Sequence, residues 1–584
     1  MIMDCANGSL HDMEESIVKP TVVANDKLPE DRRADLPYIR RNAVITRSKE
    51  ALQKFDPNED RKSSAANETT AVGDDILRSI SVEKIRDLMQ QMESDVMEQV
   101  GNQIKLIMSG VLQQLEEMQP GKQTDDLFQE TTKYSNRQKS LKDGSLPEKK
   151  FLMRNSLLTD LFKIKHIKTI YHIFIVILII LFINTAVYDI VDTGSTNFGI
   201  STIMMAFGKF NKVLWIWSGM LASTFVVYVA FSVWAHQRIH IAPKSIQLKI
   251  WDYSWLIALI VYQILFIIFP ANSLLTEDLP PASSVAVLME QVRLVMKTHA
   301  FVRSAAPRTL NYKPHTEQTN ASTCPGFTKF LYYLFCPTLI YRDDYPRTKV
   351  IRWRVVVWSY TEVILVVFYM AFIFERLLIP VFRQFGASPL EPRALVLSVF
   401  GTMMPGTLAF LCGFYCLLHS WMNASAELLR FADRMFYKDW WNSTSYDAYY
   451  RTWNVVVHDW LYTYIYKDIY EIIAPRNKML STFMVFSVSA IFHEYILAFA
   501  FRFFYPVLLV MFGGIGLILV FLTRKNEQAG GNVFMWLTLC MGTGMILSLY
   551  SMEYYARINC PPYKDEFLDL FIPRSWTCHR LSNS

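Results

Sequence analysis

Charged residues are scarce in this chain, which argues against a soluble globular protein. Only 19% of its 584 residues are Asp, Glu, Lys or Arg, and 52% are hydrophobic, whereas soluble proteins carry about 25% charged residues. The sequence also lacks a dense basic run with interleaved aromatic residues, so nucleic-acid binding is not expected. The net charge of +6 is more typical of Lys and Arg on the cytosolic loops of a membrane protein.

We expect no secretory signal peptide at the start of the sequence, because the first residues contain no basic segment followed by an apolar core. We therefore expect the first long apolar run, residues 167–187, to serve as its own membrane signal. Basic residues crowd the N-terminal side of this run, whereas Asp189 and Asp192 follow it. The excess of Lys and Arg predicts a cytosolic N-terminus.

Polar residues are concentrated in the first quarter of the chain. Residues 1–75 are rich in charged and amide side chains without sustained periodicity, and we predict that they are disordered. Within 76–119, apolar residues recur every three or four positions from Ile85 to Met118, which predicts an amphipathic helix. Such a helix must bury its stripe, either by self-association, the interpretation preferred here, or against the chain's own membrane domain. Residues 120–150 are interpreted as a linker.

The remainder, residues 151–584, contains apolar runs that are long enough to cross a membrane. A hydrocarbon core of about 30 Å requires about 20 helical residues. We expect an all-α, polytopic membrane protein with about nine transmembrane helices. Eight runs are clear, near 167–187, 212–235, 251–270, 355–380, 393–418, 479–500, 503–522 and 533–551.

A ninth, weaker run at 282–303 is included because of charge balance. The loops at 236–249 and 341–354 are both basic and hence cytosolic, so two spans must lie between them. Four ionisable residues interrupt the weaker run, and at the bilayer centre a charged residue costs about 2.5–3.5 kcal/mol on insertion scales. We expect those side chains to face other helices or a cavity: Glu290, Arg293, Lys297 and His299.

Nine spans place the C-terminal tail, residues 552–584, in the lumen. Cys560 and Cys578 bracket a proline-containing segment of this tail. Because the secretory lumen is oxidising, we predict a disulfide between them, with two free thiols as the alternative. Cys412 and Cys416 lie one turn apart on an expected membrane helix and are interpreted as packing residues.

The longest polar interruption of the membrane part, residues 419–478, is cytosolic in this topology and unusually aromatic. It contains FYKDWWN at 436–442 and a run of Tyr and Trp at 445–468. Such residues suit a boundary that is apolar on one side and wet on the other. The segment is either an interfacial helix–loop–helix or a wall of a site that admits an amphiphile from the cytosol.

His493 and Glu494 lie in the middle of a run that is otherwise able to span the membrane. His493 is either a hydrogen-bonded residue between helices or a general base, since a neutral imidazole can accept a proton at cytosolic pH. A zinc site is not expected, because Leu497 replaces the second histidine of H-E-x-x-H. A rival base is His458, which lies one turn from Asn454. The residues alone leave this choice open.

At these positions the chain resembles a known family. FYKDWWN is similar to the F-Y-x-D-W-W-N signature of the sterol and diacylglycerol branch of the membrane-bound O-acyltransferases. YRDDYPRTKVIRW, RTWNVVVHDWLY, AIFHEYILAFAF and PRSWTC resemble the sterol O-acyltransferase subgroup. These motifs follow one another in the order of that subgroup between about residue 150 and the end of the chain. Only the N-terminal region is unmatched.

The resemblance implies an endoplasmic-reticulum enzyme that transfers a fatty acyl group from acyl-CoA to a sterol such as cholesterol. His493 would be the catalytic histidine and Asn454 its partner, with Cys560 and Cys578 joined in the lumen. No metal or cofactor is expected beyond acyl-CoA as co-substrate. The N-terminal helix would mediate a homo-oligomer, either a dimer or a dimer of dimers. The expected acyl-CoA side comprises Phe436, Tyr437, Lys438, Asp439, Trp440, Trp441, Asn442 and His458.

Two other functions stay open. The acceptor of the same chemistry could be diacylglycerol or a long-chain alcohol, because acceptor choice depends on the shape of a tunnel. A different class of protein, a sterol or lipid transporter, is less favoured, since the sequence has no inverted repeat and no matching pair of broken spans.

Overall fold

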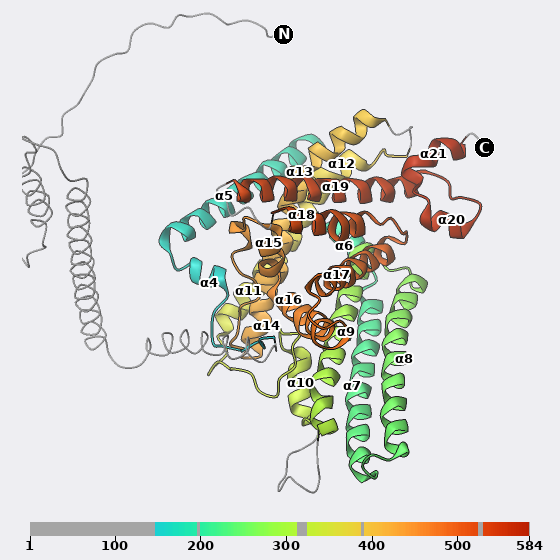
Figure 1. Cartoon of the computed structure of the whole chain (residues 1–584). Coiled ribbons are helices and arrows are strands. Elements are labelled where there is room, and N and C mark those ends of the chain that lie inside the picture. Colours follow the sequence, from blue (N-terminus) through green and yellow to red (C-terminus); the bar gives the residue numbers. More distant parts are fainter. Residues whose placement is uncertain (1–145, 195–198, 312–323, 387–390, 524–529, 583–584) are drawn as a thin grey trace, which may run out of the picture. The chain divides into compact units, whose positions relative to one another are not determined.

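The computed structural model describes residues 146–194, 199–311, 324–386, 391–523 and 530–582 (Figure 1). The predicted disordered segment 1–75, the amphipathic helix 76–119 and most of the linker 120–150 lie outside these residues. Across the described ranges the regular elements are helices, and β-type pairing is limited to two isolated bridges, Arg154–Asp433 and Arg347–Phe431. The all-α prediction is confirmed.

Seven helices of the described residues are long and apolar enough to cross a membrane, and each coincides with a run expected from the sequence. Two of them contain a π-helical stretch, which widens the helix locally and is frequent near functional sites. The seven are α5 (Lys165–Thr193), α7 (Phe210–His240), α8 (Ile246–Thr276), α11–η1–α12 (Trp353–Phe382), α13–η2–α14 (Pro392–Leu428), α17 (Lys478–Phe501) and α19 (Gly531–Asn559).

The weaker run at 282–303 forms α9 (Pro281–Asn311), a helix of 31 residues that packs against α7, α8 and α17. It is too polar to be one of the seven, and its ionisable side chains are satisfied by protein. Arg293 pairs with Glu290, and the buried Lys297 donates to the backbone carbonyls of Tyr333 and Cys336 at 2.5 and 2.7 Å. These side chains therefore face neighbouring elements, as expected.

The run at 503–522 is helical over a shorter stretch than expected. Its regular part is η6 (Leu509–Gly516) followed by α18 (Leu517–Thr523). The chain turns at Arg502, which has a left-handed backbone (φ 63°), and Phe503, Phe504 and Tyr505 continue without helical hydrogen bonding. The number of nine spans stays a prediction, because η6 and α18 together form a short helix of 15 residues.

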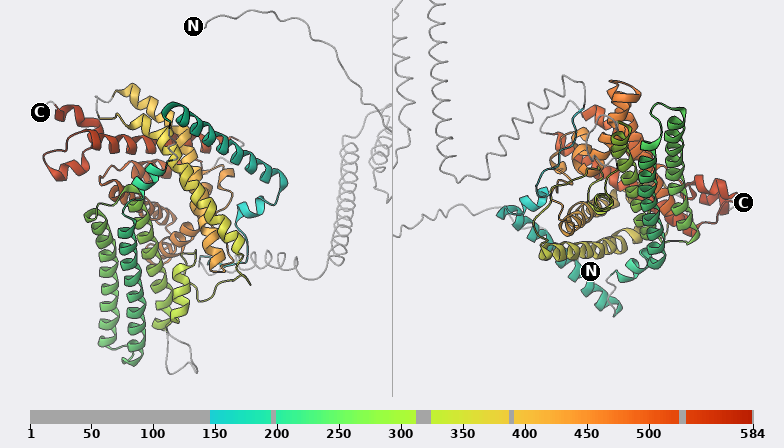
Figure 2. Two further views of the ribbon diagram at one scale, coloured as in Figure 1. Left: turned by 180° about the vertical axis from the view of Figure 1, so that it is seen from behind. Right: turned by 90° about the horizontal axis from the view of Figure 1, so that it is seen from below.

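The start of the expected cytosolic segment 419–478 continues the long helix α13–η2–α14 as far as Leu428, and the short helices η3 to η5 follow, of which η4 and η5 pack against α17. In the described chain, α17 packs against α9, η4 and η6, and α13 packs along α19; both views of Figure 2 show α7 and α8 side by side at one flank. The remaining helices are α4 (Leu157–Leu161), α6 (Ile200–Ala206), α10 (Phe327–Phe335), η3 (Trp440–Asn442), α15 (Tyr446–Trp453), α16 (Val455–Leu461), η4 (Tyr462–Tyr466), η5 (Ile469–Ile473), α20 (Glu566–Phe571) and α21 (Arg574–Ser582).

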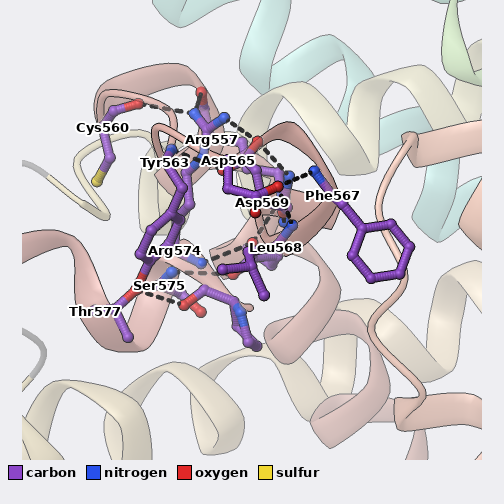
Figure 3. Close-up of polar contacts among 12 residues, drawn as sticks. Arg557, Cys560, Tyr563, Asp565, Phe567, Leu568, Asp569, Arg574, Ser575 and Thr577 are labelled. Atoms are coloured by element: carbon purple, nitrogen blue, oxygen red, sulfur yellow. Dashed lines mark hydrogen bonds and ion pairs between the residues drawn. The ribbon is translucent and has the colours of Figure 1, made fainter. Parts of the chain in front are cut away.

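The C-terminal tail is folded onto the end of α19. Cys560 and Cys578 are joined by a disulfide, and Figure 3 shows the polar contacts beside it. Arg574 donates to both oxygens of Asp569, at 2.8 and 2.5 Å, and this hydrogen bonding lowers the pKa of Asp569 below its ordinary value. The buried carboxylate of Glu553 accepts the first backbone N–H groups of α21, from Arg574 and Ser575. The tail is therefore ordered by paired charges as well as by the disulfide.

Candidate active site

His493 lies near the middle of α17, and its side chain is exposed in the folded chain. Its Nδ1 is 2.7 Å from the carbonyl oxygen of Ser489, one helical turn earlier. Because a carbonyl only accepts, Nδ1 must carry the proton when the ring is neutral, which leaves Nε2 as the free acceptor nitrogen. The helix itself therefore holds the tautomer that a general base needs.

Aromatic side chains line one side of this imidazole. Phe512 of η6 lies against His493 with ring centroids 5.3 Å apart. Phe512 also contacts Phe486 of α17 and Tyr450 of α15, at 5.8 and 5.2 Å. Tyr450 belongs to the aromatic segment 419–478, so this segment reaches the histidine of the membrane helix through Phe512. We call Tyr450, Phe486 and Phe512 the aromatic wall.

Two glycines let η6 approach this wall closely. A Cβ at Gly516 would lie 2.5 Å from Tyr450 Oη, and a Cβ at Gly513 would lie 2.9 Å from Ala490 Cβ. Real Cβ atoms essentially never approach so closely. The sequence FGGIG of η6 thus places Phe512 on His493 by keeping its neighbours free of side chains.

Asn454 joins α15 to α16. It ends α15, and its Oδ1 accepts the N–H of Val457 at 3.2 Å, so that it caps α16. Among the described residues, its amide nitrogen has no hydrogen-bond partner. Asn454 follows Tyr450 of the aromatic wall by one helical turn, and its amide hydrogens are available to a ligand.

His458 lies one turn further, on α16, where it is half-buried. Its Nδ1 is 3.5 Å from Asp459 Oδ1, and Asp459 also pairs with Lys149. Burial raises the pKa of Asp459, but the hydrogen bond from His458 and the charge of Lys149 outweigh burial and hold this pKa below its ordinary value. His458 is therefore paired with a carboxylate, unlike His493.

His458 begins a ladder of parallel rings that sequence reasoning missed. It stacks on Tyr462 with an interplanar angle of 14°, Tyr462 stacks on Tyr466 at 14°, and Tyr466 stacks on Tyr470 at 10°. The centroids are 6.4, 5.6 and 5.9 Å apart. The regular spacing of four residues was visible in the sequence and could have revealed this aromatic ladder.

The segment FYKDWWN divides into buried and exposed residues. Phe436, Tyr437 and Trp440 are at most 1% exposed, Trp441 is half-buried, and the other three, Lys438, Asp439 and Asn442, are exposed. Tyr437 Oη lies 2.6 Å from Nδ1 of the buried His419 on η2. The carbonyl of Trp441 accepts from the side chains of Asn532 and Trp536 on α19.

The buried rings of this segment hold distant helices together. Trp440 packs against Phe414 of α13, Trp453 of α15 and Trp536 of α19, with centroids 5.1, 4.7 and 5.5 Å apart. Trp453 precedes Asn454, so this packing also determines where Asn454 lies. The exposed side chains of Lys438, Asp439 and Asn442 are the ones that can meet a solvent-borne ligand directly.

A groove of about 600 Å³ runs between α7 and α8. Its lining is mostly apolar, with the hydroxyls of Ser223 and Tyr262 3.3 Å apart and the ion pair of Lys212 and Glu277 at one end. Gly219 leaves part of it open, because no atom lies within 4 Å of the position of a Cβ there. The groove can accommodate an apolar molecule from the membrane.

Comparison with known proteins gives consistent results. Residues 200–552 match the family described as MBOAT, membrane-bound O-acyltransferase family. The chain is 44% identical to sterol O-acyltransferase 1 of Mus musculus over 452 residues. This alignment covers 77% of this chain and 83% of the mouse protein. The chain is also 40% identical to sterol O-acyltransferase 2 of Homo sapiens over 437 residues. That alignment covers 74% of this chain and 81% of the human protein.

Proposed function

This chain belongs to the membrane-bound O-acyltransferase family, and we propose that it transfers a long-chain fatty acyl group from acyl-CoA to the 3β-hydroxyl of a sterol such as cholesterol. It is a multi-pass membrane enzyme. The names of the similar proteins support a sterol as the acceptor. The observation that carries the mechanism is His493, which lies within a membrane helix with Nε2 free to accept a proton.

The proposed reaction is a direct transfer. The sterol oxygen attacks the thioester carbonyl carbon while its proton passes to Nε2 of His493. The carbon–sulfur bond then breaks, and the imidazolium returns the proton to the leaving thiolate, so that sterol ester and CoA are formed. Base catalysis of this kind contributes about 10²–10⁴-fold. No acyl-enzyme is required.

Asn454 is the proposed partner of His493. Its amide hydrogens would donate to the oxyanion that develops on the thioester carbonyl, since its Oδ1 is already occupied by the N–H of Val457. Loss of one such donor typically costs about 10²–10³-fold in rate. The interaction would also hold the thioester beside the aromatic wall before the sterol arrives.

The polar end of acyl-CoA would stay on the cytosolic side. Lys438 is exposed there and offers a positive charge to phosphate, with the remaining residues of FYKDWWN forming the surrounding wall. The aromatic ladder from His458 to Tyr470 offers flat faces on which the adenine ring can stack. The acyl chain would enter the membrane domain along the aromatic wall, and the sterol would enter laterally from the bilayer, with the α7–α8 groove as its docking place.

We also propose an endoplasmic-reticulum location with a cytosolic N-terminus and a lumenal C-terminus. The disulfide of the C-terminal tail supports the lumenal side, because the lumen is oxidising. The proposed assembly is a homo-oligomer, either a dimer or a dimer of dimers, that forms through residues 76–119.

The central test is the substitution of His493, the proposed base. His493→Ala should abolish ester synthesis in a folded, assembled protein, while His458→Ala should lower it less. Near-normal turnover of His493→Ala would show that the base is another residue. In parallel, radiolabelled oleoyl-CoA is supplied with cholesterol, diacylglycerol or a long-chain alcohol. We expect sterol ester to dominate; faster esterification of either other acceptor would overturn the assignment, and no CoA release with any acceptor would indicate a transporter.

A further inference from the structure

Glu494 is a buried carboxylate beside the proposed base. It is 3% exposed and follows His493 on α17, so the two side chains leave the helix about 100° apart. An ionisable side chain in a membrane-spanning helix is costly unless protein groups satisfy it. Its partners show what it holds in place.

The partners of Glu494 are on two other helices. The backbone N–H of Leu509 donates to Oε2 at 3.0 Å, and Tyr550 Oη of α19 lies 2.9 Å from each carboxylate oxygen. The N–H of Leu508 in turn donates to Tyr550 Oη at 3.2 Å. Both N–H groups belong to the start of the helix that contains η6, where no earlier helical turn can accept them.

The same short helix carries Phe512, which lies against the imidazole of His493. Phe512 follows Leu509 by three positions, so the carboxylate and the aromatic contact hold the same first turn of η6. If the first turn moves, Phe512 and the glycines that pack on α17 and Tyr450 must move with it. The position of the imidazole therefore depends on the residue that follows it in sequence.

We propose that Glu494 is a positioning residue: together with Tyr550 it anchors the start of η6, and through Phe512 it sets the orientation of the His493 ring for proton transfer. This proposal rests on the proposed role of His493. Glu494 itself does not touch the substrates. Its function is to accept hydrogen bonds at the start of a helix, where the backbone N–H groups have no helical carbonyl to bind. This helix start lies within the membrane domain, where water cannot serve as the acceptor.

The test compares purified full-length variants. Glu494→Leu removes the acceptors, whereas Glu494→Gln keeps a carbonyl oxygen for Leu509 N–H and an amide that can donate to Tyr550 Oη. We expect Glu494→Leu to lower kcat about 100-fold, since a misplacement of about 1 Å can cost that much. KM for acyl-CoA should change less than about twofold, and the pH profile of kcat should shift, because the environment of the ring has changed. Glu494→Gln should recover most of kcat and the wild-type profile.

Tyr550→Phe gives an independent variant in case Glu494→Leu does not fold. It removes one hydroxyl that bridges Leu508 N–H and Glu494, and we expect a smaller loss of kcat with a shift of the pH profile in the same direction. The matched control is Glu553→Gln, which alters an equally buried carboxylate on α19 that holds α21. It should lower Tm without shifting the pH profile.

The outcomes separate this proposal from the proposed function. If His493→Ala is inactive but the profile and kcat of both Glu494→Leu and Tyr550→Phe match wild type, the positioning role is wrong and the base assignment stands. A loss of kcat that follows Tm equally in the Glu494 and Glu553 variants would also overturn the proposal. If His493→Ala keeps its turnover, the base assignment fails whatever the Glu494 variants show.

Discussion

Gly516→Ala tests whether the close contact between η6 and Tyr450 determines the geometry around His493. The added Cβ would lie 2.5 Å from Tyr450 Oη, and its next contacts, at 3.4 Å to the Met511 carbonyl and 3.6 Å to Tyr450 Cζ, are ordinary. Because van der Waals contact needs about 3.4 Å rather than 2.5 Å, Tyr450 and η6 must move apart by about 0.9 Å. The strain is thus confined to one hydroxyl.

This displacement should reach the imidazole through the aromatic wall. Tyr450 packs on Phe512 at 5.2 Å and Phe512 on His493 at 5.3 Å. A shift of this size near a reacting group can cost about 10²-fold in rate, so we expect kcat for sterol ester synthesis to fall about 10–100-fold. Ala is favoured over Gly within a helix by about 1 kcal/mol, which offsets part of the strain, so Tm should change little.

A rescue and a matched control make the result specific. In Gly516→Ala/Tyr450→Phe the clashing oxygen is absent, and kcat should recover at least tenfold relative to Gly516→Ala. Gly514→Ala lies in the same helix, but its Cβ would meet nothing within 4 Å, so turnover and Tm should stay near wild type. The reasoning is refuted if Gly516→Ala is as active as Gly514→Ala, or if adding Tyr450→Phe to Gly516→Ala does not restore activity.

Three further predictions concern sites away from this contact. Gly219→Phe should fill the α7–α8 groove and raise KM for sterol several-fold without changing KM for acyl-CoA; equal effects on both substrates would exclude the groove as the sterol's docking place. Asp569→Asn should lower stability by about 1.5–3 kcal/mol at pH 7 in thermal unfolding, because one of the two hydrogen bonds from Arg574 and the opposite charge of the carboxylate are lost. Since the folded pKa of Asp569 is lowered, this contribution is complete above its ordinary value of 3.8 and disappears as pH falls through the folded pKa; a difference that persists below both values contradicts the assignment. Asn442, Ser443 and Thr444 form an N-glycosylation sequon whose Asn442 is exposed. It should carry no sugar in cells, because we propose that it faces the cytosol, and a mobility shift after glycosidase treatment would place it in the lumen.

Membrane helices were predictable because hydropathy is a local property of the chain. The seven apolar helices need only about 20 suitable residues in succession, and each was located from its run. The segment at 503–522 shows the limit of this signal. Phe503, Phe504 and Tyr505 are as apolar as the residues of a membrane helix, but they follow the left-handed turn at Arg502 and are not helical. Mean hydropathy does not distinguish such a turn from a helix.

The candidate site was only partly predictable, because burial depends on residues far away in sequence. The aromatic character of FYKDWWN suggested a boundary between apolar and wet surroundings. The structure instead encloses Trp440 between Phe414 and Trp536, which are separated from it by 26 and 96 positions along the chain. No local pattern reports such contacts. The aromatic ladder is the opposite case, since its period of four residues was present in the sequence.

The three consecutive polar residues of α17, His493, Glu494 and Tyr495, show how a membrane helix can contain polar groups at one level. Side chains leave a helix about 100° apart, so each residue meets a different neighbour. Tyr495 Oη lies 2.8 Å from Gln291 Oε1 on α9 and 3.2 Å from the Ile267 carbonyl on α8.

The same Gln291 compensates for a proline in α8. Pro270 has no N–H for the carbonyl of Phe266, four residues earlier, and the amide of Gln291 donates to this carbonyl at 2.8 Å. Tyr495 thus fastens α17 to α8 and α9, while Glu494 fastens it to η6 and α19. Because Glu494 and Tyr495 are both engaged in holding the surrounding helices, His493 is the one of the three polar residues that keeps a free ring nitrogen for chemistry.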